Sequence, residues 1–366
     1  MEYIKLNELC EINIGKTPSR SNSDYWGIGN KWLSIADLKS KYVSEAKEEI
    51  TDLAVEEAKM RVVPKNTVVM SFKLSIGKLA ILQEDMYTNE AIANFRIKNK
   101  ELITPEYLYY ALKTLNFDNS TDRAVMGATL NKSKLNDIKI PYCKIDIQKK
   151  IVEVLDKSQS LIDKKKEQID LLDDLVKSRF IEMFGDPIKN EKNWEIELLG
   201  EICDLKAGKN IKASEIHEEQ TDDLYPCYGG NGLRGYVNKY SHEGNINLIG
   251  RQGALCGNVK YARGKFYATE HAVVTQPKIE INSYWLHFVL IELNLNRLST
   301  GAAQPGLTIG KLNEVEVILP PIELQNEFAE FVTQTDSIRS KMEASLSELE
   351  DNFNSLMQKA FKGELF

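Results

Sequence analysis

Two long segments that lack both glycine and proline constrain the fold more than any other feature of this sequence. They run from Asp146 to Phe184 and from Ile322 to Lys362. Apolar residues in each recur at alternating steps of four and three, the 3.5-residue period of a coiled-coil seam. At 1.5 Å per residue, each helix would be about 58 Å long, longer than a small domain is wide. The sequence therefore predicts two long helices that pack on each other, with seam residues that include Ile151, Leu155, Ile162, Val176, Phe328, Ile338, Met342 and Leu349.

The chain also contains an internal repeat. Residues 134–184 align without a gap on residues 311–361, with 12 identities in 51 positions. The pairs Gln148/Gln325 and Phe184/Phe361 stay in register, and LNELCEINIGK near the N-terminus matches LGEICDLKAGK after the first helix. The chain is thus predicted to be one unit present twice, each copy a strand-rich region followed by a long helix. This order favours an antiparallel helix pair with a globular unit at each end.

The globular units are predicted to be mixed α/β. NTVVMSFKLSIGKLAIL and ARGKFYATEHAVVTQPKI have the alternation and β-branched residues of strands, whereas PEYLYYALKTL and SYWLHFVLIEL are predicted short core helices. The fold class is therefore α+β: two mixed α/β domains in a tandem pseudo-repeat, separated by two long helices that form an antiparallel coiled coil. The predicted boundaries are 1–144 for the first domain, 145–185 for the first helix, 186–321 for the second domain and 322–366 for the second helix.

The acidic charge of the chain is confined to its end. The net charge is −7, and the segment from Leu312 onward alone has 4 basic and 11 acidic residues, whereas residues 1–311 have 43 of each. Net charge therefore neither excludes nor supports a nucleic-acid partner. The five cysteines are widely spaced, no apolar run approaches a membrane span, and the N-terminus lacks a signal pattern. We expect a cytoplasmic protein with no membrane partner.

The stretch YPCYGGNGLRGYV contains Gly230, Gly232 and Gly235 at the spacing G-x-G-x-x-G. A dinucleotide-binding turn needs a buried strand before these glycines, a helix after them and an acid about 20 residues further on. The preceding YPCY is short and contains proline, the following residues alternate like a strand, and the acid is missing. The sequence predicts no cofactor. Gly229, Gly230, Gly232 and Gly235 are instead predicted to form a tight turn between short strands that presents Arg234.

Catalytic motifs are incomplete elsewhere in the chain. Gly15-Lys16-Thr17 resembles the end of a phosphate-binding loop, but Cys10 stands where the first glycine belongs. The four histidines lack metal-ligand spacing. ILPPI lacks the flanking residues of an adenine methyltransferase motif. We expect a binding and spacing protein that is not itself an enzyme.

Two further stretches carry a resemblance to a known family. GAAQPGLTIGKLNEVEVILPPIELQNEFAEFV with the helix after it, and KSRFIEMFGDP at the end of the first helix, resemble the DNA-specificity subunit of type I restriction–modification systems. The resemblance covers essentially the whole chain, as two target-recognition domains each followed by a helix. The first copy, MGATLNKSKLNDIKIPYCKID, lacks the glutamine and the double proline of the second, which affects the details of its loop.

The resemblance implies that each domain recognises one half of a split target in double-stranded DNA. It also implies that the helices set the gap between the halves and dock two methyltransferase subunits, which in turn bind ATP-dependent restriction subunits. Methyl transfer and cleavage would belong to these partners. Two alternatives remain: a coiled-coil scaffold that binds only protein, and a self-contained DNA methyltransferase or nuclease, which would require a cofactor or metal motif.

DNA recognition requires basic and amide side chains at loop tips. The candidates in the first unit are Lys16, Thr17, Ser19, Arg20, Lys73 and Lys78, and those in the second are Lys209, Arg234, Arg251, Gln252 and Gln304. For each of them, the alternative is an ordinary solvated surface residue. Arg234 and Arg251 are the first choices because their glycine neighbours allow a loop backbone to approach DNA closely.

Overall fold

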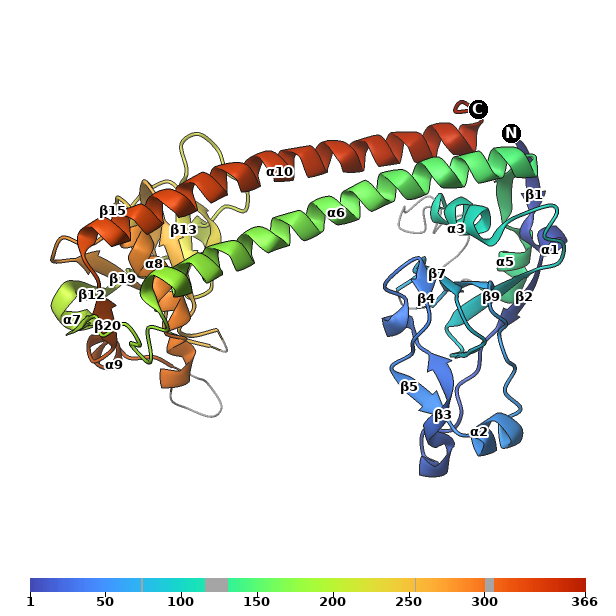
Figure 1. The fold of residues 1–366 in the computed structure, drawn as a ribbon, viewed down its shortest axis with the longest axis horizontal. Coiled ribbons are helices and arrows are strands. Elements are labelled where there is room, and N and C mark those ends of the chain that lie inside the picture. The colour runs from blue at the N-terminus through green and yellow to red at the C-terminus, as the bar shows by residue number, and fades with distance from the viewer. Residues whose placement is uncertain (74, 116–130, 254, 300–305) are drawn as a thin grey trace. The chain divides into compact units, whose positions relative to one another are not determined.

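The chain divides into two compact units. A computed structural model describes residues 1–73, 75–115, 131–253, 255–299 and 306–366 (Figure 1). The first unit comprises Met1–Lys166 with Ser345–Phe366, and the second comprises Glu167–Ala344. Each unit contains one globular part and a stretch of both long helices. None of the helices in the described part of the chain has the length and apolar character needed to cross a membrane.

The two predicted long helices are present. Helix α6 spans Ile145–Phe184 and helix α10 spans Ile322–Lys362. Each is followed by a glycine in the left-handed region, Gly185 with φ 76° and Gly363 with φ 82°. Glycine is favoured at this position because it lacks the Cβ that would strain the conformation. The sequence therefore encodes the helix ends as well as their length.

The helices contact each other in both units, and their direction is seen in the second. There Asp173 of α6 pairs with Arg339 of α10 at 2.5 Å, and Arg179 of α6 pairs with Glu327 of α10 at 3.0 Å. Residue numbers thus increase along α6 while they decrease along α10, so the helices are antiparallel in this unit. In the first unit, Lys166 of α6 forms an ion pair of 2.7 Å with Glu350 of α10.

The apolar seam follows the predicted period only in part. Ile151, Leu155, Ile162 and Val176 are buried as predicted, but Ile338 is 50% exposed, so its assignment to the seam is wrong. A straight helix rotates by about 20° per heptad relative to a strict 3.5-residue repeat. At this point the neighbouring Arg339 lies against α6, where it pairs with Asp173.

The described residues of the first unit form three sheets. Its five-stranded sheet has the order β2 (Cys10–Ile14), β9 (Ile92–Ile97), β6 (Val68–Ser71), β7 (Leu79–Leu82) and β4 (Tyr42–Val43). A three-stranded sheet has the order β5 (Glu48–Ile50), β3 (Trp26–Leu33) and β8 (Tyr87–Thr88). Strands β1 (Glu2–Lys5) and β10 (Lys139–Tyr142) form a two-stranded ribbon. The short helices are α1 (Leu6–Leu9), α2 (Asp52–Glu57), α3 (Pro105–Lys113) and α5 (Lys132–Asp137).

The second unit repeats this arrangement. One four-stranded sheet, which corresponds to the five-stranded sheet of the first unit, has the order β12 (Cys203–Ala207), β19 (Ala272–Pro277), β16 (Ile246–Gly250) and β17 (Val259–Ala262). The next has the order β14 (Gly232–Val237), β13 (Tyr225–Gly229), β18 (Lys265–Ala268) and β15 (His242–Glu243), and β11 (Glu195–Leu198) pairs with β20 (Glu316–Leu319). The short helices are α7 (Leu199–Ile202), α8 (Ser283–Glu292) and α9 (Ile309–Asn313). The predicted tandem repeat of mixed α/β units is confirmed.

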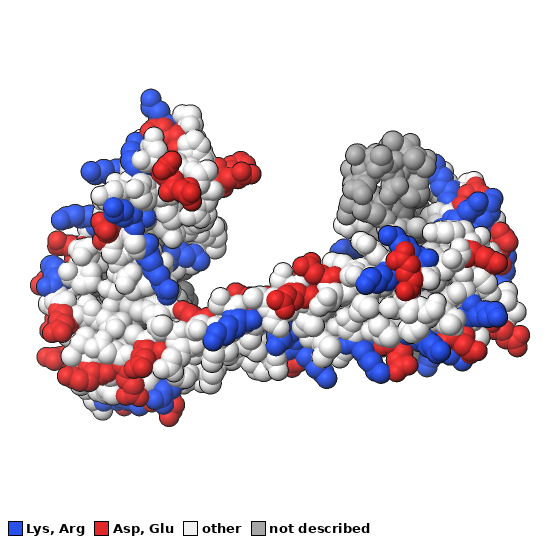
Figure 2. Space-filling view, turned by 90° about the horizontal axis from the view of Figure 1, so that it is seen from above, with Lys and Arg blue, Asp and Glu red and all other residues white. Residues whose placement is uncertain are grey.

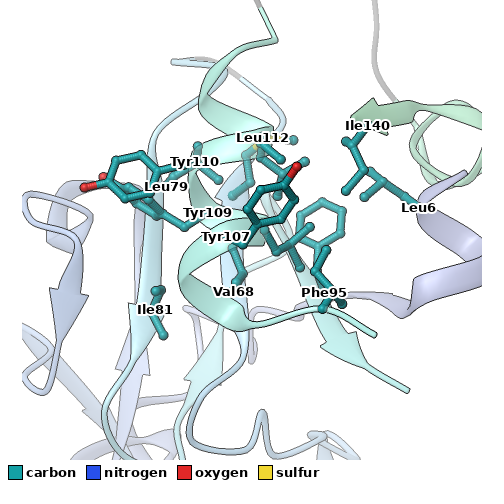
Figure 3. Packing of buried hydrophobic residues seen from close by; sticks show 14 of the residues in the cluster. Leu6, Val68, Leu79, Ile81, Phe95, Tyr107, Tyr109, Tyr110, Leu112 and Ile140 are labelled. Atoms are coloured by element: carbon teal, nitrogen blue, oxygen red, sulfur yellow. The ribbon is translucent and has the colours of Figure 1, made fainter. Parts of the chain in front are cut away.

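The predicted core helices pack on sheets, α3 on the five-stranded sheet and α8 on the four-stranded sheet that contains β12 and β19. Figure 3 shows Tyr107 and Leu112 of α3 beside Val68 and Phe95 of the sheet. In the second unit, the fully buried Trp285 of α8 lies in the corresponding core. Because each core holds α3 or α8 against one face of its sheet, the loops at the strand ends have a fixed support.

Candidate nucleic-acid interface

The loops that follow β2 in the first unit and β12 in the second are built in the same way. The backbone N–H of Lys16 donates to Thr88 at 2.8 Å, and that of Lys209 donates to Ala268 at 2.9 Å. A Cβ on Gly15 would lie 2.2 Å from the carbonyl oxygen of Asn89, and a Cβ on Gly208 would be equally close to that of Ala268. The repeated Gly-Lys therefore marks a close crossing of two backbone segments, which places Lys16 and Lys209 in equivalent loops.

A second pair of equivalent loops connects β6 with β7 and β16 with β17. The N–H of Phe72 donates to Ala91, and the N–H of Arg251 donates to His271, each at 3.0 Å. These bonds align Phe72 with Arg251 and therefore Lys73 with Gln252. Similarly, Ser71 donates to Lys78 and Gly250 donates to Asn258, each at 2.9 Å. The candidates from the two repeats thus lie in matching loops but differ in side chain.

Several candidates of the first unit already have partners. Lys16 is exposed, and its ammonium donates to the carbonyl of Ala58 at 2.6 Å. The hydroxyl of Thr17 donates to Glu90. Arg20 bonds both oxygens of Glu48, at 2.5 and 2.9 Å. Its guanidinium carbon also lies 3.6 Å from the centre of the Trp26 ring.

The remaining candidates of this unit are more accessible. Lys73 and Lys78 are exposed in the β6–β7 loop, and Ser19 is exposed with its hydroxyl 2.8 Å from that of Ser21. Arg20 would have to leave Glu48 to contact a base, whereas Lys73 and Lys78 would not need to break an ion pair of this kind. Their exposure therefore makes Lys73 and Lys78 better candidates than Arg20 for contacts with a nucleic acid.

The glycine-rich stretch of the second unit forms the hairpin β13–β14. Gly229 pairs with Gly232 at its end. A Cβ on Gly250 would lie only 1.9 Å from the carbonyl oxygen of Gly230, so the hairpin end crosses directly over the end of β16. The predicted turn is confirmed for these residues, and the G-x-G-x-x-G spacing is followed by a strand instead of the helix of a dinucleotide-binding motif.

YPCY lies in the short strand β13, of which only Cys227 is buried, so it fits the predicted turn between short strands and not the buried strand of a dinucleotide-binding motif. Pro226 has no partner in the ladder with β18, which joins Cys227 and Tyr228 to that strand. One detail of the prediction for this stretch was wrong. Gly235 lies within β14 and not in the turn, with φ 145°, and a Cβ there would be 2.5 Å from the carbonyl oxygen of His217.

The hairpin end and two loops enclose a cavity of about 460 Å³. It is lined by Arg234 of β14, Gln252 of the β16–β17 loop and His271, together with the glycines of the hairpin. Two predicted candidates, Arg234 and Gln252, are thus brought together. His271 was not predicted as a site residue. The equivalent residue of the first repeat is Ala91, so comparison of the two repeats does not indicate a functional side chain at this position.

Arg251 and Lys209 have different surroundings. Arg251 is half-buried, and its buried Nε atom has no hydrogen-bond partner among the residues that the structure describes. Its carbonyl accepts a bond of 2.9 Å from the N–H of Leu307. Lys209 is exposed, and its charge is the second cause, after burial, of the lowered pKa of His242. Gln304 lies outside the described residues.

The surface charge agrees with the balanced composition of residues 1–311. On the face shown in Figure 2, lysine and arginine residues are interspersed with acidic residues over both units and along the helices. On this face, local groups of cations would therefore have to supply contacts to an acidic partner.

Comparison with known proteins identifies the family. The family model for the type I restriction modification DNA specificity domain matches residues 1–172 and residues 191–351. The chain belongs to this family. The match to a specificity subunit confirms the resemblance noted in the sequence, and it gives no support to a protein-only scaffold or a self-contained enzyme.

Two specificity subunits illustrate the relationship. The specificity subunit of the type I restriction enzyme EcoprrI from Escherichia coli is 31% identical over 360 residues, which cover 93% of this chain and 89% of that protein. The MjaIX specificity subunit from Methanocaldococcus jannaschii is 27% identical over 369 residues, with 90% and 85% covered.

A solved structure supports the same fold. The type I restriction–modification S subunit from M. genitalium matches with a TM-score of 0.61 and 17% identity. The match covers 98% of this chain and 96% of that one. The specificity-subunit fold, with two mixed α/β domains in tandem and long helices, is therefore established for this chain.

Proposed function

We propose that this specificity subunit is itself non-catalytic and that each globular unit recognises one half of a bipartite target in double-stranded DNA. The observation that carries the proposal is the pairing of equivalent loops with different side chains. Lys73 corresponds to Gln252, and Lys78 corresponds to Asn258. Lysine contacts guanine or phosphate, whereas glutamine and asparagine favour adenine. The same scaffold would thus recognise two different half-sites.

The long helices would set the gap between the half-sites and dock two methyltransferase subunits. Both α6 and α10 run through the two units without interruption. Leu161, Leu171 and Leu175 of α6 are exposed apolar residues, which suits a helix surface that a partner covers. In this arrangement residues 1–144 and 186–321 are the recognition domains, and the complex acts in the cytoplasm.

The catalytic activities would belong to the partner subunits. The methyltransferase subunits would modify adenine, and ATP-dependent restriction subunits would bind through them and cleave DNA. This division of labour is supported by the incomplete cofactor and catalytic motifs of the sequence. In this proposal the chain contributes the choice of the site and the distance between its halves.

The proposal is tested by mapping methylated adenines in the genome of the source cell with and without this gene. We expect one bipartite motif to lose its methylation when the gene is deleted. Exchange of residues 1–140 for those of a relative should then change one half of that motif and leave the other intact. A motif that persists after deletion, or two halves that change together, would contradict the proposal.

A further inference from the structure

A cavity of about 450 Å³ in the first unit has more basic than acidic residues in its lining. Lys16, Lys59, Arg61 and Arg96 contribute basic side chains, and Glu11 is the acid that lines it. Among the described residues, Lys59, Arg61 and Arg96 form no ion pair within 4.0 Å. We call this cavity the basic pocket. Its excess of positive charge contrasts with the balanced charge of residues 1–311 as a whole.

The basic pocket lies on the face of the larger sheet opposite α3. Arg96 of β9 is paired across the ladder with Glu11 of β2. Their strand neighbours Phe95 and Ile12 point into the core beneath α3, and successive side chains of a strand point to opposite faces. Lys16 belongs both to this pocket and to the loop after β2, so the pocket is continuous with a loop already proposed to contact DNA.

Lys59 has a conformation that a lysine does not favour. It follows the end of α2 in the left-handed region, with φ 49°. The N–H of Lys59 donates to Glu56 at 3.2 Å, and that of Met60 donates to Val55 at 2.9 Å. This is the Schellman arrangement, in which glycine is usual because it has no Cβ. A strained residue of this kind points to a role for its side chain, here an exposed ammonium at the cavity.

Glu11 compensates only part of the positive charge. Its carboxylate accepts a bond of 2.9 Å from the side-chain amide of Asn13. This bond is the first cause of its lowered pKa, and the charges of Arg96, Lys132 and Arg61 lower the pKa further. A single carboxylate thus accompanies the four basic side chains that line the pocket, and an additional anion could be accommodated.

The second unit differs at the equivalent position. There Asp204 of β12 pairs with Gln276 of β19, as Glu11 pairs with Arg96 in the first unit. The cation of the first unit is thus replaced by an uncharged amide. The difference suggests that the basic pocket belongs to the first unit rather than to the common scaffold.

We propose that the basic pocket binds a backbone phosphate of the DNA at the half-site held by the first unit. This inference rests on the proposed function and extends it, since it adds Lys59, Arg61 and Arg96 to the contact residues. Phosphate contacts fix the register of a protein on DNA without contributing sequence information directly. The DNA affinity contributed by the first unit would therefore depend more strongly on salt concentration than that contributed by the second.

Lys59→Gly tests the proposal, because a loss of DNA binding in this variant could be distinguished from a loss of folding. The substitution removes one charge and relieves the strained backbone, so the melting temperature should stay the same or rise. Binding of a target duplex by the full chain with its methyltransferase subunits should weaken. The slope of log affinity against log salt should become shallower by about 0.9, the contribution of one phosphate contact. Lys100→Gly, which removes an exposed lysine of the same unit outside the pocket, should leave the slope unchanged.

Arg61→Ala and Arg96→Ala should change the slope in the same direction while the methylated motif keeps its sequence. Salt titrations that superimpose on the wild type for all three variants would overturn the pocket proposal and leave the proposed function intact. A wild-type complex that does not bind the duplex would instead refute the proposed function. Titration with inorganic phosphate tests whether the pocket binds free phosphate instead of the DNA backbone. If phosphate saturates the pocket without any loss of DNA affinity, the assignment of the pocket to DNA is overturned.

Discussion

The side-chain oxygen of Gln148, in the first turn of α6, accepts a hydrogen bond of 3.1 Å from the backbone N–H of Thr104, the N-cap residue of α3. Gln325 of α10 makes the same connection, at 2.9 Å, to Asn282, the N-cap residue of α8. Both glutamines are buried. Each long helix is therefore attached to the core helix of its own unit by an equivalent buried amide.

Replacement of these glutamines should destabilise the unit concerned. Gln148→Leu would leave the N–H of Thr104 and the carbonyls of Leu102 and Cys143 without their partner. We expect a loss of unfolding free energy of about 1–3 kcal/mol for each group left unsatisfied, measured by denaturant unfolding. Gln168→Leu, at an exposed position of α6, is the control. A Gln148→Leu variant as stable as this control would contradict a structural role for the amide.

Stability should fall in mild acid because of His287. Burial, and then the charges of Lys260 and Arg263, lower the pKa of this histidine to about 4. Since the unfolded chain has a histidine pKa of about 6.5, it binds more protons between these values, and the stabilisation present above pH 6.5 is lost as the pH falls towards 4. The loss should be about 3 kcal/mol. His287→Gln should flatten this dependence, whereas His217→Gln, at an exposed position, should leave it in place.

Arg234→Ala tests the cavity at the end of the β13–β14 hairpin. If Arg234 contacts a base, the substitution should cost about 1–3 kcal/mol of binding and relax specificity at one position of the second half-site. If it contacts only phosphate, binding should weaken for every sequence and the salt slope should fall by about one charge. Methylation mapping and a salt titration of the methyltransferase complex distinguish these results. No change in affinity, specificity or slope would remove this loop from the DNA surface.

The helix pair can be lengthened in register. One heptad inserted after Ile162 of α6, with a matching heptad after Glu350 of α10, adds about 10 Å, or about three base pairs. These positions are close in the antiparallel register set by the Lys166–Glu350 ion pair. Methylation mapping should show a wider gap between unchanged half-sites. An altered half-site with the original gap would refute the proposal that the helices set the spacing.

The sequence by itself determined the features that depend on local patterns. The segments without glycine and proline, 146–184 and 322–362, coincide with α6 to within one residue and with α10, whereas the predicted range of 322–366 runs past the end of α10 at Lys362. Gly185 and Gly363 follow the two helix ends. The internal repeat predicted two similar units, because homologous segments bury the same apolar positions. Two stretches of sequence were also sufficient to indicate the family: GAAQPGLTIGKLNEVEVILPPIELQNEFAEFV, which leads into the second helix, and KSRFIEMFGDP at the end of the first.

The tertiary structure alone decided which candidate side chains meet. Arg234 and Gln252 line one cavity because the hairpin end crosses over β16, and Arg20 is held by Glu48 of β5. Lys59, Arg61 and Arg96 converge with Lys16 because β9 pairs with β2 and the segment after α2 folds against them. Such contacts join residues far apart in the chain, and their geometry depends on strand pairing and core packing, which the local sequence pattern does not specify.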